Sequence, residues 1–114
     1  MGLQNCRNGH VLATQIEFAT TFRARLKGLL GRPSLPPGNA LVLHPCSSIH
    51  TFFMRFAIDV LFLNGDFEVV AVLESLPPYR ASKIYRHSRV VVELPTGVVQ
   101  ETDTKAGDKL NFNL

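Results

Sequence analysis

Residues 49–63 constrain the fold of this 114-residue chain more than any other stretch, because they are apolar almost throughout. The segment nevertheless contains one arginine, Arg55, and one aspartate, Asp59. A segment of this composition is buried on at least one face, and a buried charge is costly unless it is paired or hydrogen-bonded. In a straight strand the two residues would lie roughly 13 Å apart. We therefore expect them to pair across a bend at Phe56-Ala57, or to reach a shared polar site.

The whole chain, residues 1–114, has the length and composition of a single folded domain. Its 46% hydrophobic and 18% charged residues are ordinary for a globular protein. No run of 18 apolar residues occurs, so no transmembrane helix is expected. Residues 1–7 lack the apolar core of a secretory signal. These features predict a cytoplasmic protein, in which Cys6 and Cys46 stay reduced.

Apolar runs and turn signals predict a mostly β domain. Strands are expected over residues 11–18, 40–44, 49–55, 59–63, 67–74, 89–94 and 109–114. Residues 20–30 are expected to form one short amphipathic helix, residues 98–103 a helical turn, and Asn64-Gly65 a type I′ hairpin turn. Several strands are continuous apolar runs, which is typical of strands covered on both faces. The predicted fold is a small closed β-barrel or a sandwich, with the helix packed on it.

Five groups of residues follow one another in an order that resembles a known family. They are 25–32 (RLKGLLGR), Met54-Arg55 with 58–63 (IDVLFL), 64–66 (NGD) with 69–71 (VVA), 92–97 (VELPTG) and 106–108 (AGD). This order resembles domain of unknown function family 192, a group of uncharacterised prokaryotic proteins, from about residue 11 to the end. The resemblance implies a small, mostly β domain and no established activity.

Positive charge is concentrated in the first half of the chain, which favours an anionic ligand. Residues 1–57 carry six Lys/Arg and one acid, for a net charge of +5, whereas residues 58–114 carry six against eight, for −2. The predicted ligand-binding residues are Arg32, Arg55, Asp59, Glu93 and His50. Arg55 would present its planar guanidinium to a carboxylate or phosphate while Asp59 orients it. The alternative is structural, with two internal pairs of an arginine and a carboxylate.

Metal binding and catalysis are the alternatives to this prediction. Cys6 and His10 have the same spacing as Cys46 and His50, and the four side chains are of the types found in zinc sites. The spacing departs from that of usual zinc motifs, so no metal and no cofactor is expected. In a hydrolase-like enzyme, Cys46 would act as the nucleophile, His44 or His50 as the base and Asp59 as the orienting acid. Cys46 lies in a loop without an evident helix start to activate it, so catalysis is the less favoured hypothesis.

Residues 79–89 contain four cations, two tyrosines and no acid, a composition that suits single-stranded nucleic acid. The residues concerned are Tyr79, Arg80, Lys83, Tyr85, Arg86 and Arg89. No recognised nucleic-acid motif accompanies them. The sequence therefore predicts a small non-enzymatic binding module for an anionic ligand or a partner protein. A hydrolase-like enzyme and a nucleic-acid accessory protein are the alternatives.

Overall fold

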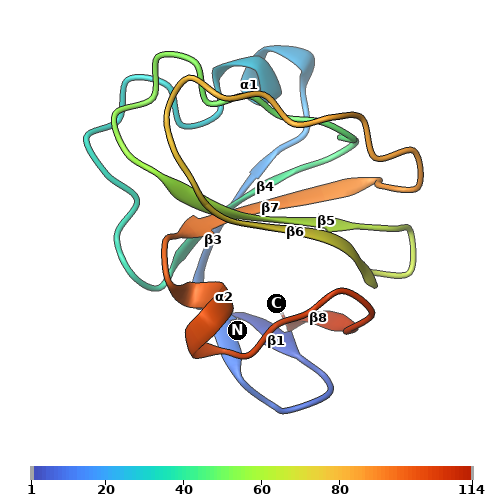
Figure 1. Ribbon diagram of the computed structural model, residues 1–114. Coiled ribbons are helices and arrows are strands. Elements are labelled where there is room, and N and C mark those ends of the chain that lie inside the picture. Colours follow the sequence, from blue (N-terminus) through green and yellow to red (C-terminus); the bar gives the residue numbers. More distant parts are fainter. Residues whose placement is uncertain (1, 114) are drawn as a thin grey trace.

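The structure, a computed structural model, describes residues 2–113, which form two β-sheets and two short helices (Figure 1). The three-stranded sheet has the order β2-β1-β8, with β1 (Gly2–Asn5), β2 (Val11–Ala13) and β8 (Leu110–Asn113). The five-stranded sheet has the order β3-β4-β7-β5-β6, with β3 (Gln15–Ala19), β4 (Asn39–Leu43), β5 (Ile58–Leu63), β6 (Val69–Leu76) and β7 (Val90–Pro95). The helices are α1 (Phe22–Lys27) and α2 (Val98–Glu101), and neither is long and apolar enough to cross a membrane.

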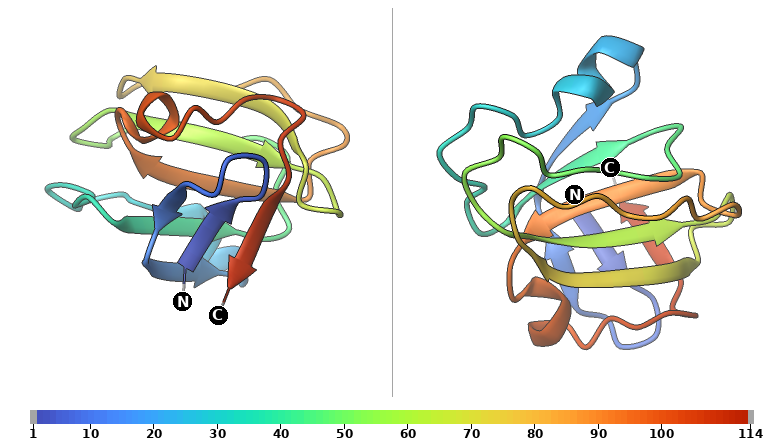
Figure 2. Two further views of the ribbon diagram at one scale, coloured as in Figure 1. Left: turned by 90° about the horizontal axis from the view of Figure 1, so that it is seen from below. Right: turned by 45° about the horizontal axis from the view of Figure 1, so that its top comes forward.

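Apolar cores cover both faces of the five-stranded sheet. One core lies between the two sheets and joins residues such as Leu3 of β1 and Val92 of β7. The other lies on the opposite face, beneath α1 and the long loops 44–57 and 77–89 (Figures 1 and 2), and includes Leu29 and Leu43. Because both faces are covered, β5 is buried along its whole length, as its continuous apolar sequence predicts.

The predictions of a mostly β domain and of a helix within residues 20–30 are confirmed, but the described residues form no closed barrel. Residues 11–18 were expected to form one strand and instead form two. The chain breaks at Thr14, so that β2 pairs with β1 in one sheet and β3 pairs in parallel with β4 in the other. This change of sheet joins the two layers and leaves both sheets open at their edges.

Two further sequence predictions differ from the structure. Residues 49–55 form a loop, not a strand, and only His50 makes an isolated bridge, to Ala81. The β5–β6 hairpin forms, but its turn is not type I′, because its left-handed residue is Phe67 (φ 61°). The reason is local: the Asn64 side chain accepts backbone N–H bonds from residues 66 and 68, at 2.9 and 3.0 Å, and so organises a longer loop.

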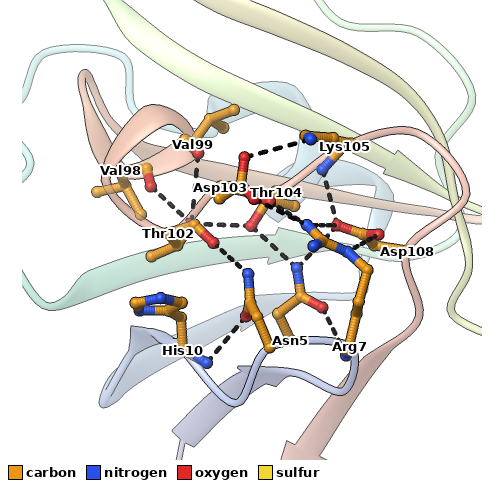
Figure 3. A network of polar contacts seen from close by, with 11 residues as sticks. Asn5, Arg7, His10, Val98, Val99, Thr102, Asp103, Thr104, Lys105 and Asp108 are labelled. Carbon is orange, nitrogen blue, oxygen red and sulfur yellow. Dashed lines mark hydrogen bonds and ion pairs between the residues drawn. The ribbon is translucent and has the colours of Figure 1, made fainter.

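A polar network joins the turn after β1 to the loop before β8 (Figure 3). Arg7 donates from Nε to Oδ1 of Asp108 (2.7 Å), from Nη2 to its Oδ2 (3.1 Å), and to the carbonyl of Asp103. The Oδ2 atom also accepts from the Asn5 amide and the Lys105 N–H, both at 2.9 Å. The hydrogen bond from Arg7 is the largest of the effects that hold the pKa of Asp108 well below its usual range.

Replacing Asp108 with asparagine is expected to lower the free energy of unfolding by about 2 kcal/mol at pH 7, because buried charge-assisted bonds are lost. The folded-state pKa of Asp108 is depressed, so its stabilisation is present above its ordinary pKa of 3.8 and declines as the pH falls below that value. The variant should therefore lose less stability than the parent between pH 5 and pH 3. Urea unfolding at these pH values measures the effect, with Asp66→Asn in the exposed hairpin loop as control. A loss below about 0.5 kcal/mol at pH 7 would contradict the expectation.

Candidate functional site

A cavity of about 360 Å³ lies between α1 and the five-stranded sheet and is open to solvent on one side. We call it the α1 cavity. Phe22 and Leu26 of α1 line it although they are 74% and 59% exposed. No residue of α1 is fully buried. Ala24 packs against the core, whereas Phe22 and Leu26 on the apolar side of the helix border this cavity. The deeper walls are apolar and buried, and they include Leu29, Leu43, Ile49 and Met54.

The boundaries of α1 follow from its capping residues. The side chain of Thr21 accepts a hydrogen bond from the N–H of Ala24 at 3.1 Å, which satisfies a free donor of the first turn. Gly28 ends the helix with a φ of 48°, a left-handed value that is unfavourable for residues with a side chain. The chain then turns back at once, so that residues 28–30 also line the α1 cavity.

Glu93 lies in the wall of the α1 cavity that the sheet provides. It is in the central strand β7, opposite Leu41 of β4 and Val60 of β5, whose side chains belong to the core beneath α1. Glu93 is 3% exposed, and its Oε1 has no hydrogen-bond partner among residues 2–113. Burial raises the pKa of Glu93 to about 8, an effect that the charge on Arg32 partly opposes. At neutral pH the carboxyl therefore holds a proton, and a protonated carboxyl is a hydrogen-bond donor.

Cys46 and His50 also line the α1 cavity, and among residues 2–113 their side chains hydrogen-bond to neighbouring residues and not to each other. The thiol of Cys46 donates to the carbonyl of Ser48 at 3.1 Å, and burial raises its pKa. The His50 ring stacks on the Phe52 ring, with centroids 5.3 Å apart. The Nδ1 atom of His50 accepts a hydrogen bond from the backbone N–H of Phe52. Asp59, the third residue of the hydrolase hypothesis, binds three backbone N–H groups elsewhere, so nucleophile, base and orienting acid are not connected.

The predicted ligand-binding residues are only partly brought together. Glu93 and His50 both line the α1 cavity. Arg32 instead binds Glu17 of β3 through two hydrogen bonds of 3.0 and 2.8 Å, which occupy its guanidinium fork. Arg55 is exposed in the loop before β5 and makes no ion pair within residues 2–113.

Asp59 is satisfied by backbone donors, not by Arg55, which corrects the predicted pair. Its side chain is 1% exposed, and its Oδ1 accepts from the N–H of Ser75 at 2.8 Å. Its Oδ2 accepts from the N–H groups of Gly97 and Val99 at 3.1 and 3.0 Å. Asp59 therefore caps the first turn of α2 and fixes the end of β6.

The basic segment 79–89 lies beside residues 47–51, to which backbone hydrogen bonds attach it. This contact places Arg86 and Arg89 next to Arg25 of α1, around a shallow second hollow that Pro45 and Cys46 also line. We call it the arginine hollow. It adjoins the α1 cavity, because residues 25, 45 and 46 line both.

The aromatic residues of the basic segment do not form a free stacking platform. Tyr85 packs on the buried Phe62, with ring centroids 4.3 Å apart, and Lys83 lies 5.1 Å from the Tyr85 ring centre. Tyr79 is exposed, but its ring contacts Phe52 and Phe53. Both tyrosine rings therefore pack against other aromatic side chains of the protein.

Sequence reasoning did not assign Arg25 or the apolar walls to the site. One signal was present, because three of the five groups that carry the family resemblance meet at the α1 cavity. The cavity lining includes residues 25–30 of the first group, Met54 of the second and Glu93 of the fourth. Such segments are distant in the sequence, and only the fold brings them together.

Comparisons with known proteins identify the family. The profile of DUF192, described as Uncharacterized ACR, COG1430, matches residues 3–112. A UPF0127 protein of Pyrococcus furiosus is 34% identical over an alignment of 114 positions that covers 96% of each chain. A UPF0127 protein of Thermococcus sibiricus is 30% identical, over 98% of this chain and 75% of that protein.

The fold also matches a solved structure. A protein of unknown function from Novosphingobium aromaticivorans superposes with a TM-score of 0.83, over 96% of this chain and 81% of that chain. The two sequences are only 21% identical, so this likeness shows the shared fold alone. The sequence matches confirm the resemblance: the chain belongs to the DUF192 (UPF0127) family of uncharacterised proteins.

Proposed function

We propose that this protein is a small-molecule binding module whose ligand occupies the α1 cavity. The observation that carries the proposal is the buried carboxyl of Glu93, whose Oε1 has no partner among residues 2–113. A buried polar atom without a partner costs about 1–3 kcal/mol. Because Glu93 lines the cavity, a ligand that supplies a partner for its carboxyl group would recover part of this free energy on binding.

The walls of the cavity favour a ligand with an apolar body. Leu29, Ile49 and Met54 are buried in the deep part of the cavity, while Phe22 and Leu26 at its lining remain exposed. Covering exposed apolar side chains is favourable by about 25 cal/mol per Å². Largely apolar walls with a few polar groups are typical of small-molecule sites.

Binding is favoured over catalysis by the state of Cys46. A nucleophilic cysteine needs a lowered pKa, whereas burial raises the pKa of this thiol. Its hydrogen bond goes to a backbone carbonyl, which does not accept a proton as a base.

Hexan-1-ol is a suitable first probe, because it combines an apolar body with one hydrogen-bonding group. We expect its backbone amide shift changes to map to the α1 cavity, around residues 28–30, 46–49 and 93. It should also slow alkylation of Cys46 by iodoacetamide, while Cys6, which is exposed in the turn after β1, reacts unchanged in the same molecule.

A cavity-filling variant supplies the matched control. Ser48 is exposed and lines the cavity, so Ser48→Phe should weaken hexan-1-ol binding, whereas Ser34→Phe, at an exposed position outside the lining, should not. Hexanoate, 6-hydroxyhexanoate and hexyl phosphate are further probes with the same apolar body. If neither hexan-1-ol nor any of these probes changes the amide shifts or the rate of Cys46 alkylation at millimolar concentration, the proposal is wrong.

A partner protein is the second candidate, favoured by one observation. Phe52, Phe53 and Tyr79 are 41%, 71% and 56% exposed, and their rings contact one another. Exposed aromatic clusters are enriched at protein interfaces. Phe53→Ser should abolish a partner interaction without changing hexan-1-ol binding, so the two functions are separable in one variant.

A further inference from the structure

We propose that the ligand of the α1 cavity is an organic anion with an apolar body, whose carboxylate or phosphate group is held by Arg25, Arg86 and Arg89. This inference rests on the proposed function and names the chemical class of the ligand. It moves the anion-binding role from Arg32 and Arg55, which the sequence predicts, to three different arginines.

The first support is the continuity of the two spaces. The arginine hollow is lined by Arg25, Arg86 and Arg89, and it adjoins the α1 cavity at Arg25 and Cys46. A ligand whose body occupies the cavity and whose end projects at this junction therefore meets the guanidinium groups without any change in the fold.

The positive charge of the arginine hollow is not balanced by acidic residues, which is the second support. No acidic residue lines the arginine hollow, and none of its three arginines makes an ion pair within residues 2–113. Arg25 is held in place by one bond, from Nη1 to the carbonyl of Pro45 at 3.0 Å, which leaves its other donors for a ligand. Guanidinium groups bind carboxylate and phosphate through paired, charge-assisted hydrogen bonds. Three such groups around one hollow thus favour an anion.

The third support is the protonated side chain of Glu93 in the wall of the same cavity. Glu93 is neutral at pH 7, since its pKa is raised to about 8, and therefore does not repel an anionic ligand. As a protonated acid it donates a hydrogen bond to an oxygen atom of the ligand. The arrangement suits a molecule that carries an anionic group for the arginines and a hydroxyl or carbonyl oxygen for Glu93.

Four probes test the inference by NMR titration at pH 7: hexan-1-ol, hexanoate, 6-hydroxyhexanoate and hexyl phosphate. We expect hexanoate to bind about tenfold more tightly than hexan-1-ol, and 6-hydroxyhexanoate more tightly than hexanoate. The preference for the anion should weaken as salt is added. The hexyl phosphate arm distinguishes a phosphate group from a carboxylate group as the preferred anion, and tight binding of either supports the inference.

Matched double variants test the arginines. Arg86→Gln with Arg89→Gln should weaken hexanoate binding about tenfold and leave hexan-1-ol binding unchanged. Arg55→Gln with Arg80→Gln removes the same net charge from exposed arginines outside both linings, and should change neither. All four positions are exposed, so the variants are expected to fold.

The outcomes separate this inference from the proposed function. Equal affinity for hexanoate and hexan-1-ol would contradict the proposed anionic ligand but not the proposed binding of a small molecule in the α1 cavity. If none of the four probes binds, both proposals are wrong. Loss of hexanoate binding in the Arg55/Arg80 control places the anion elsewhere and contradicts the inference. Tighter binding of a single-stranded oligothymidylate than of any small anion, dependent on Arg80 and Lys83, contradicts it in favour of nucleic acid.

Discussion

Replacement of Asp59 with alanine is expected to lower the free energy of unfolding by about 3–5 kcal/mol, because one buried and two half-buried backbone N–H groups lose their acceptor. These donors belong to Ser75, Gly97 and Val99, on two segments that pack against β5. Urea unfolding measures the global effect, and amide hydrogen exchange at the three positions should accelerate. The loss of the cap should affect α2 first.

Arg55→Ala is the decisive control for Asp59. If the arginine were the partner of the buried carboxylate, its removal would be about as costly as the removal of Asp59. The structure places Arg55 at the surface, so its loss should change stability by less than about 0.5 kcal/mol. Equal effects of the two variants would restore the ion pair that the sequence predicts.

Glu93 should make the protein less stable as the pH rises. Its folded-state pKa of about 8 exceeds its ordinary value of 4.5, so between these values the folded protein retains a proton that the unfolded chain has released. The free energy of unfolding therefore falls as the pH increases through this window, by on the order of 5 kcal/mol. This slope is opposite in sign to the contribution of Asp108 at acidic pH.

Glu93→Gln removes the titration and keeps a neutral side chain of similar shape. The variant should match the parent near pH 5 and exceed it in stability at pH 9, in urea unfolding measured across the range. Glu74→Gln, at an exposed position of β6, is the matched control and should keep the parental profile. Parallel profiles for the parent and Glu93→Gln would mean that the carboxyl is solvated or paired.

Burial of the candidate site residues was largely predictable from local sequence. Glu93 and Asp59 each lie in an apolar strand segment, and both are buried, at 3% and 1% exposure. The sequence also indicates that each carboxyl needs a partner. It does not indicate the partner, which is a set of backbone N–H groups for Asp59 and no group within residues 2–113 for Oε1 of Glu93.

The partners of the arginines were likewise not predictable from the sequence. Arg32 and Glu17 are fifteen residues apart and bind because β3 runs parallel to β4 and the intervening chain returns across the sheet. Arg86 and Arg89 meet Arg25 because loop 77–89 lies along residues 47–51. No local sequence pattern predicts that Arg32 contacts Glu17, or that Arg86 and Arg89 lie beside Arg25.

The sequence by itself determined the elements whose causes are local. Continuous apolar runs specify strands such as β5 and β7, helical spacing specifies a helix within residues 20–30, and the family order specifies a mostly β fold. The end of α1 at Gly28, earlier than the predicted end, was seen only in the structure. The tertiary structure alone decided the α1 cavity, its unpaired carboxyl and the arginine hollow. The physical reason is that strand and helix formation depend on neighbours along the chain, whereas the partner of a charge depends on which distant segments the sheet topology brings within hydrogen-bond distance.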